Sequence, residues 1–184
     1  RQRQMCIRDR INAVVMPGVN EEDIVPLADY AVHHGAQLRF IEQMPLGPRE
    51  QWRREDMVTA EDILARLRTH FSMTPAREPR GSAPAALWEV SAPDGTHGTL
   101  GIIASVTHPF CGDCDRTRLT TDGAIRNCLF GNSETPLRDL LRSGASDAEI
   151  MEAWAGEMWT KKPGHGIDDE GFLQPDRPMS AIGG

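Results

Sequence analysis

The chain has 184 residues, which suffices for one compact core and not comfortably for two. Acidic residues outnumber basic ones by 27 to 20 for a net charge of −7, so no broad basic surface is available for nucleic acid. The mean hydropathy is −0.43 and no apolar run approaches about 18 residues, so we expect a soluble protein without membrane contact. No signal peptide opens the chain, and we expect a cytoplasmic location that keeps cysteines reduced.

The first ten residues, RQRQMCIRDR, differ from the rest of the chain. They show no hydrophobic periodicity and run directly into a clear strand pattern at Ile11. We therefore predict a non-native leader over residues 1–10 and leave Cys6 out of the predicted sites. A native strand that starts at Ile11 also indicates a fragment of a longer protein.

A strand–helix–strand pattern follows the leader. The residues INAVVM, from Ile11, form a buried strand pattern that ends at a Pro-Gly pair. Apolar residues then recur at helical spacing between Asn20, the predicted N-cap, and Gly35, the predicted stop. Residues 38–44, LRFIEQM, form the second strand. Because such a unit places its strands in parallel, the sequence predicts an α/β layer.

Two units joined by a linker are predicted over the remaining chain. A helix from the N-cap Thr59 through Phe71 completes a first unit over 11–72, and a stretch rich in Pro, Arg and Ala forms a linker over 73–86. A smaller C-terminal domain then spans 87–184. Its predicted elements are strands 87–91 and 99–106, joined by a Pro-Asp-Gly turn, and helices 136–143 and 146–160. Ser146 is the N-cap of the last helix, whose apolar face we expect to be core: Ile150, Ala153, Trp154 and Met158.

Three cysteines stand at the spacing C-x2-C-x13-C: Cys111, Cys114 and Cys128. Two thiolates on a tight turn, with a third from a neighbouring strand, can converge on a metal ion or a cluster. Two interpretations stay open from the spacing alone. One is a closed zinc site with His108 as fourth ligand (Cys3His), and the other is an iron–sulfur cubane with one open iron that can bind a substrate.

Two arginines follow the second cysteine and favour an anion beside a cluster. Arg116 and Arg118 alternate on an extended segment, so they share a face and can together bind phosphate oxygens. An Asp-Gly pair downstream predicts a three-residue hairpin loop with Gly123 in the left-handed region. That register pairs Arg118 with Arg126 and Arg116 with Cys128, and it turns the guanidiniums of Arg116 and Arg118 toward Cys128.

The chain resembles the GTP 3′,8-cyclase family of radical S-adenosylmethionine enzymes from Ile11 to Gly184. The resemblance is carried by FCGDCDRTRLTTDGAIRNCLF, INAVVMPGVN, LRFIEQMPLG and MSAIGG. Members of this family open molybdenum cofactor biosynthesis by converting GTP to (8S)-3′,8-cyclo-7,8-dihydroguanosine 5′-triphosphate. They carry two [4Fe-4S] clusters: an N-terminal one, on C-x3-C-x2-C, that cleaves S-adenosylmethionine, and a C-terminal one that binds the guanine. This chain contains only the second motif.

The resemblance implies the C-terminal part of an incomplete radical-SAM (β/α) barrel, followed by a smaller α+β domain that holds a [4Fe-4S] cluster. The site residues it implies are Cys111, Cys114 and Cys128 as cluster ligands, Arg116, Thr117 and Arg118 as GTP contacts, and Met44 as an S-adenosylmethionine contact. Gly183 and Gly184 resemble the double-glycine tail that reaches into the family's active site. Arg10 replaces a GTP-contacting lysine of the family and falls in the predicted leader.

We therefore expect the chain to supply the GTP-binding half of the cyclase and to be inactive alone, because it lacks the motif of the cluster that cleaves S-adenosylmethionine. The expected partners are GTP and, in the pathway, the next enzyme, cyclic pyranopterin monophosphate synthase. A homodimer is left open. The alternative from another class is a non-enzymatic structural zinc-binding module built on the Cys3His set.

Overall fold

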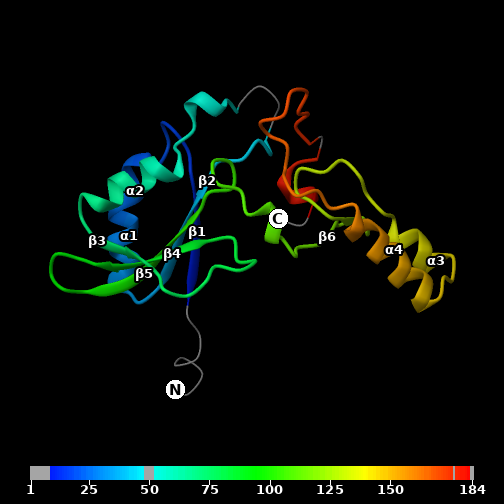
Figure 1. Cartoon of the computed structure of the whole chain (residues 1–184), viewed down its shortest axis with the longest axis horizontal. Helices are drawn as coiled ribbons and strands as arrows, with labels where there is room; N and C mark the ends of the chain where they lie inside the picture. The colour runs from blue at the N-terminus through cyan, green and yellow to red at the C-terminus, as the bar shows by residue number, and fades with distance from the viewer. Residues whose placement is uncertain (1–8, 48–51, 176, 183–184) are drawn as a thin grey trace, which may run out of the picture. The chain divides into compact units, whose positions relative to one another are not determined.

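The computed structural model describes residues 9–47, 52–175 and 177–182. The chain divides into unit 1, Arg1–Met44 with Arg53–Pro109, and unit 2, Pro45–Trp52 with Phe110–Gly184. Both units combine helices and strands, so the predicted mixed α/β class is confirmed (Figure 1). None of the helices in the described ranges has the length and apolar character needed to cross a membrane.

Unit 1 is built on a five-stranded sheet with the order β1-β2-β5-β4-β3. Its strands are β1 (Arg10–Val15), β2 (Gln37–Glu42), β3 (Ser72–Pro75), β4 (Ala86–Ser91) and β5 (His97–Ile103). The strands β1, β2 and β5 run parallel, and β4 and β3 continue the sheet in antiparallel pairs. Helix α1 (Ile24–His33) connects β1 to β2, so the predicted strand–helix–strand unit is confirmed.

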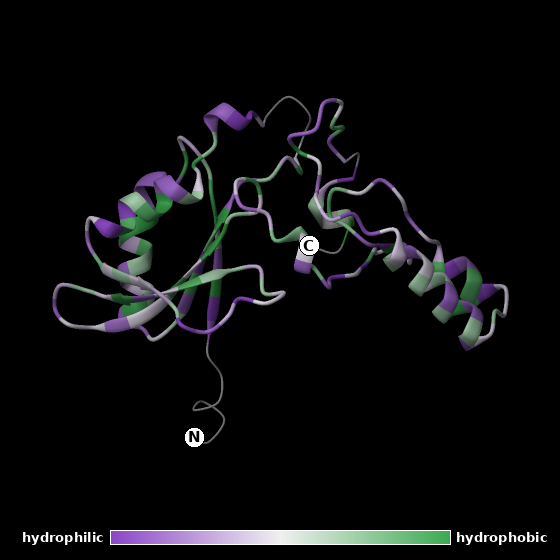
Figure 2. Ribbon diagram, viewed as in Figure 1, coloured by the Kyte–Doolittle hydropathy of each residue, from purple (hydrophilic) through white to green (hydrophobic). Residues whose placement is uncertain are grey.

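The core of unit 1 lies between one face of the sheet and two helices, α1 and α2 (Ala60–Arg68). Figure 2 shows hydrophobic residues concentrated in these strands and helices. Ile24 of α1 and Ile63 and Leu67 of α2 are fully buried with Phe40 of β2 and Leu100 of β5. Each such side chain contributes about 1.5–3 kcal/mol by leaving water, so this face holds the unit together.

The start of α2 matches its sequence signal, whereas the start of α1 does not. The hydroxyl of Thr59 accepts from the backbone N–H of Asp62, whose carboxylate accepts from the Thr59 N–H, so the predicted N-cap is confirmed. Asn20, in contrast, makes no side-chain cap. Its Oδ1 accepts from the Met16 N–H at 2.8 Å and its amide donates to the Val14 carbonyl at 3.0 Å. Asn20 therefore closes the turn after β1.

The predicted boundaries of the first unit need correction. Residues 72–75 form β3 and are not linker, and residues 86–103 belong to the sheet of unit 1 through the parallel pairing of β5 with β2. An edge strand tolerates the proline that made 73–86 resemble a linker, because Pro75 stands at the end of β3. The C-terminal segment of unit 2 begins at Phe110, well after the predicted residue 87. At the other end, β1 already includes Arg10 from the predicted leader, because backbone pairing with Gln37 does not depend on side-chain type.

Unit 2 contains two helices and a short hairpin. Helix α3 (Leu137–Arg142) packs beside α4 (Asp147–Trp159). The hairpin pairs β6 (Arg118–Leu119) with β7 (Ile125–Arg126). Ser146 caps α4 in a reciprocal capping box with Glu149, as its position before the acidic first turn predicts.

The predicted apolar face of α4 is only partly buried, since Ile150, Ala153 and Met158 are half-buried and none is a full core residue. Trp154 is 40% exposed, and the buried residue of this helix is Glu157. The carboxylate of Glu157 accepts from the hydroxyls of Ser133, at 3.1 Å, and Thr135, at 2.9 Å. Glu157 lies four residues after Ala153 and seven after Ile150, on the same side of the helix, so the predicted side of α4 faces the unit and a hydrogen-bonded carboxylate lies at its centre.

His33 makes the stability of unit 1 depend on pH. Its Nε2 lies 2.9 Å from Asp94 Oδ2 and its Nδ1 lies 2.8 Å from the Asp29 carbonyl, and these hydrogen bonds raise the pKa of His33 above 6.5. A raised folded pKa gives stability that is complete below the unfolded pKa of 6.5 and is lost as pH rises through the folded pKa. We expect His33→Asn to lower Tm slightly at pH 6 and to change it less at pH 9.

Thermal unfolding followed by circular dichroism at both pH values checks this expectation. The matched control is His34→Asn, because His34 is also exposed and bonds only within α1, to the Tyr30 carbonyl, among the described contacts. A Tm difference for His33→Asn that stays constant between pH 6 and pH 9 would contradict the proposed origin of the effect.

Candidate functional site

The three cysteines of the motif lie in unit 2, on two chain segments. Cys111 and Cys114 share one tight turn, η4 (Cys111–Asp113), which the Cys114 N–H closes by donating to the Cys111 carbonyl at 3.2 Å. Cys128 follows the end of β7 by two residues. All three side chains are half-buried and none forms a disulfide.

The hairpin between these segments has the predicted register. Arg118 pairs with Arg126, and the Thr120 N–H donates to the Ala124 carbonyl at 2.8 Å. Gly123 has φ +84°, in the left-handed region, and a Cβ there would lie 2.7 Å from the Arg138 Cβ. Glycine is therefore required at this turn both by its backbone conformation and by its neighbour.

Both arginines after the second cysteine interact with the thiols. Arg116 donates from Nη1 to the Cys114 Sγ at 3.5 Å, and its Cζ lies 4.7 Å from the centroid of the Phe110 ring. Burial lowers the pKa of Arg118, while negative charge on Cys128 and Cys114 acts to raise it. Arg116 therefore contacts one sulfur atom directly, and Arg118 interacts electrostatically with two thiols.

The thiols also interact with one another. Burial raises the pKa of Cys111, and negative charge on Cys128 and Cys114 raises it further. Burial acts in the same direction on Cys114, but the backbone N–H of Arg116 and the positive charges of Lys161 and Arg116 outweigh it, so its pKa is lowered. The thiolate is the form that binds iron or zinc, and this environment favours it at Cys114.

The donor set of this site is chemically suited to an iron–sulfur cluster. Among the residues that the structure describes, no group of three His, Cys, Asp or Glu side chains could hold a metal ion. The predicted tight convergence of the three sulfurs is therefore not confirmed, and the Cys3His zinc alternative has no support. Thiolates on different irons of a cluster lie farther apart than ligands of one ion. Three free thiols that interact electrostatically, with cations beside them, are a donor set that suits such an anionic cluster.

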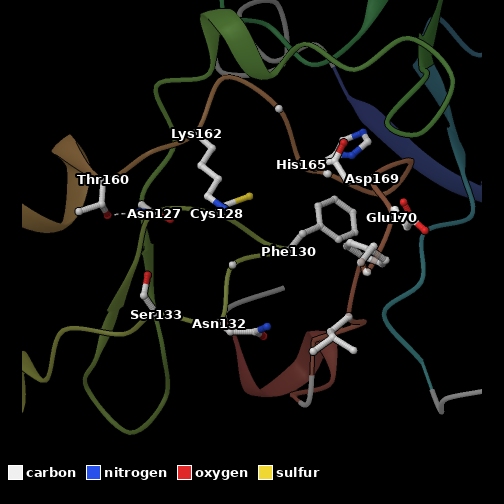
Figure 3. Close-up of a pocket in the computed structure, with 16 residues that line it drawn as sticks. Asn127, Cys128, Phe130, Asn132, Ser133, Thr160, Lys162, His165, Asp169 and Glu170 are labelled. Carbon is white, nitrogen blue, oxygen red and sulfur yellow. Dashed lines mark hydrogen bonds between the residues drawn. The ribbon is translucent and has the colours of Figure 1, made fainter.

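A cavity of about 490 Å³ opens beside Cys128 (Figure 3). Its wall includes the rings of Phe130 and His165, whose centroids are 5.4 Å apart, and the polar side chains of Asp169 and Glu170. The volume is typical of small-molecule pockets. Sequence analysis assigned no site to the segment 162–173, although a histidine between two glycines was a usable signal of close packing.

Among the described contacts, none joins the remaining predicted site residues to the three thiols. Thr117 is exposed between the two arginines, Met44 is half-buried in unit 1 two residues beyond β2, and His108 is exposed at the end of unit 1. Cys6, Gly183 and Gly184 lie outside the described residues. The predicted contact of Met44 with S-adenosylmethionine stays a prediction.

Comparison with known proteins gives a consistent set of relatives. The protein-family model Molybdenum Cofactor Synthesis C matches residues 36–167. A protein of Corynebacterium glutamicum named GTP 3′,8-cyclase is 76% identical over 178 residues, which are 95% of this chain and 47% of that protein. The GTP 3′,8-cyclase of Mycolicibacterium smegmatis is 56% identical over 95% of this chain and 49% of its own length. The chain spans about half the length of the curated relatives it matches.

Proposed function

Because the chain belongs to the Molybdenum Cofactor Synthesis C family, we propose that it is the GTP-binding half of a GTP 3′,8-cyclase, the enzyme that opens molybdenum cofactor biosynthesis. One observation carries this proposal: three free, half-buried thiols that interact with one another and lie beside two arginines. The relatives of this name, with 76% and 56% identity, support it.

Cys111, Cys114 and Cys128 would hold a [4Fe-4S] cluster by three thiolates. When bound, such a cluster supplies one iron without a protein ligand, to which a nitrogen or oxygen of guanine can bind. The three thiolates would anchor the irons, and neighbouring cations would compensate their negative charge. Arg116 would do the latter directly, by its hydrogen bond to the Cys114 sulfur.

Arg116, Thr117 and Arg118 would bind GTP through its phosphates. Two guanidiniums on one side of an extended segment can each donate two parallel hydrogen bonds to phosphate oxygens. Both also lie near the thiols, so a nucleotide that they hold is oriented with respect to the cluster. The cavity beside Cys128 is large enough for a small-molecule ligand and supports binding on this side of unit 2.

The parallel strands β1, β2 and β5 would be the last strands of an incomplete barrel. One of their faces packs on α1 and α2, whereas the other carries polar side chains, with Asn12 paired to Arg39 and Gln37 accepting from Arg39. Parallel sheets are rarely left uncovered, and a barrel would turn this polar face inward toward a site. Met44, beyond the carboxyl end of β2, would there contact S-adenosylmethionine.

The complete reaction would need more than this chain. A second cluster requires three further thiolates, and the sequence holds only Cys6 besides the motif. We therefore propose that the chain binds one cluster and GTP but forms no cyclised product alone. The complete enzyme would work in the cytoplasm and supply its product to cyclic pyranopterin monophosphate synthase.

Anaerobic reconstitution of the chain with iron and sulfide tests the proposed function. We expect about four irons per chain, broad visible absorbance, and a change in the EPR spectrum of the reduced cluster when GTP is added. Zinc is d10 and gives no such absorbance. Uptake of one zinc ion with no iron–sulfur cluster would establish the structural zinc module instead.

The arginine pair gives a quantitative prediction. We expect Arg116→Met and Arg118→Met each to weaken GTP binding by about 1.5–3 kcal/mol, or about 10- to 100-fold in Kd, because each removes charge-assisted hydrogen bonds. Isothermal titration of the reconstituted chain measures the change, and guanosine, which has no phosphates, should lose much less affinity. Arg142→Met, at the exposed end of α3, is the control with the same change in charge. Equal losses for GTP and guanosine would contradict phosphate binding.

A further inference from the structure

Lys161 lies just beyond α4 and bridges the two segments that carry the thiols. Its half-buried side chain donates from Nζ to the Arg116 carbonyl at 2.6 Å and to the Asn127 carbonyl at 2.5 Å. These carbonyls stand two residues after Cys114 and one residue before Cys128. One ammonium therefore fixes the spacing between the two backbone segments close to Cys114 and Cys128.

The bridge acts where backbone pairing stops. In the described chain β6 and β7 pair at only two positions, of which Arg118–Arg126 is nearer to the cysteines. Two paired positions are too few to hold together the segments that continue beyond the hairpin, so another contact is needed there. The ammonium of Lys161 supplies that contact.

The end of α4 also holds Asn127 by its side chain. The amide nitrogen of Asn127 donates to the Glu157 carbonyl at 3.0 Å and to the Thr160 hydroxyl at 2.7 Å, the latter marked in Figure 3. Asn127 is buried. The residue before Cys128 is thus bound at its carbonyl and at its side chain by one helix end, which restricts the position of the thiol.

A lysine is chemically suited to this position. Among the 20 basic residues of the chain only Lys161 and Lys162 are lysines, and all others are arginines. A compact ammonium directs its donors tetrahedrally and can serve two converging carbonyls, whereas a planar guanidinium is longer and presents its donors as a fork.

We propose that Lys161 is a positioning residue for the cluster: its ammonium sets the separation of the segments carrying Cys114 and Cys128 and places a positive charge at these segments. This inference rests on the proposed function, since it concerns the same three cysteines. Lys161 acts through two backbone carbonyls and not on the substrate.

The test compares the reconstituted wild-type chain with Lys161→Met, Lys161→Arg and the control Arg142→Met. We expect Lys161→Met to release iron to a chelator about 10- to 100-fold faster, as losses of contacts behind metal ligands do. We also expect a more negative reduction potential, since the reduced cluster is the more negative form and loses a nearby cation. Lys161→Arg should restore the potential but not the retention of iron. Arg142→Met, with the same change in net charge, should alter neither.

The outcomes separate the two proposals. A wild-type chain that takes up no iron–sulfur cluster overturns the proposed function. If the wild-type chain takes up the cluster, and Lys161→Met releases iron at the same rate and has the same reduction potential, only the role of Lys161 is overturned. Where Lys161→Met fails to fold, folded Lys161→Arg decides: faster release of iron than from wild type supports the geometric tie, and equal release overturns it.

Discussion

Replacing Glu42 with alanine should lower the free energy of unfolding by about 2–6 kcal/mol, because it leaves two buried backbone donors without a partner at about 1–3 kcal/mol each. Glu42 ends β2 and is completely buried. Its Oε1 accepts from the Ala60 N–H at 2.8 Å and the Thr107 hydroxyl at 2.5 Å. Its Oε2 accepts from the N–H groups of Val106, at 2.8 Å, and Thr107, at 2.9 Å. One side chain therefore joins the end of β2, the start of α2 and the chain after β5.

The chemistry of the site accounts for the size of this effect. A carboxylate has about four acceptor positions, and here four donors occupy them. Alanine leaves the buried N–H groups of Ala60 and Val106 without a partner, each costing about 1–3 kcal/mol, whereas the half-buried N–H of Thr107 costs less. Glutamine has the shape of glutamate, but its amide nitrogen is a donor and would face donors of the protein. Glu42→Gln should therefore lower the free energy of unfolding by about 2–3 kcal/mol.

Urea denaturation followed by circular dichroism measures both losses. Glu89→Ala is the control, because Glu89 is exposed on β4 and its replacement should change stability by no more than about 0.5 kcal/mol. A Glu42→Gln chain as stable as wild type would contradict the acceptor role of the carboxylate.

Local signals in the sequence predicted the parts of the fold that local interactions determine. The capping boxes at Thr59 and Ser146 each involve residues three positions apart. The hairpin register depends on the short loop that contains Gly123. The parallel pair of β1 and β2 follows from a single helical connection. Each of these features can be derived from a short window.

The order of the sheet could not be derived in this way. That β5 pairs with β2 depends on contacts about 60 residues apart, such as Arg39 with Gly101, which no local pattern specifies. The burial of Glu157 on α4 is a similar case, because its partners Ser133 and Thr135 lie 24 and 22 residues away. The hydrophobic periodicity predicted the side of α4 that faces the unit but not the buried carboxylate on that side.

The candidate site also combines features that are local in the sequence with features that depend on long-range contacts. The spacing of the cysteines and the alternation of Arg116 and Arg118 were visible in the sequence because they lie within one stretch. Lys161 was not, since the carbonyls it binds are 45 and 34 residues away. Sequence motifs identify the groups that carry chemistry, and the residues that position those groups come from elsewhere in the chain.

Replacing Cys128 with serine should abolish stable cluster binding. Cys128 supplies the one thiol that does not lie on the η4 turn, so the variant retains only Cys111 and Cys114 for a cluster that needs three protein ligands. Serine differs by one atom, and its hydroxyl is a poor iron ligand at neutral pH, so the fold should survive while the ligand is lost. After anaerobic reconstitution and desalting, we expect iron to fall from about four per chain to less than about one, with loss of the visible absorbance.

Cys6→Ser is the matched control for this prediction, because Cys6 is the only other cysteine and lies outside the motif. It should keep the full iron content, and GTP should still alter its EPR spectrum. With S-adenosylmethionine and a strong reductant, neither wild type nor Cys6→Ser should form 5′-deoxyadenosine, since one thiolate beyond the motif cannot hold a second cluster. If Cys128→Ser kept its iron, or if the wild-type chain formed 5′-deoxyadenosine catalytically, these three cysteines would not be the ligands of a substrate-binding cluster.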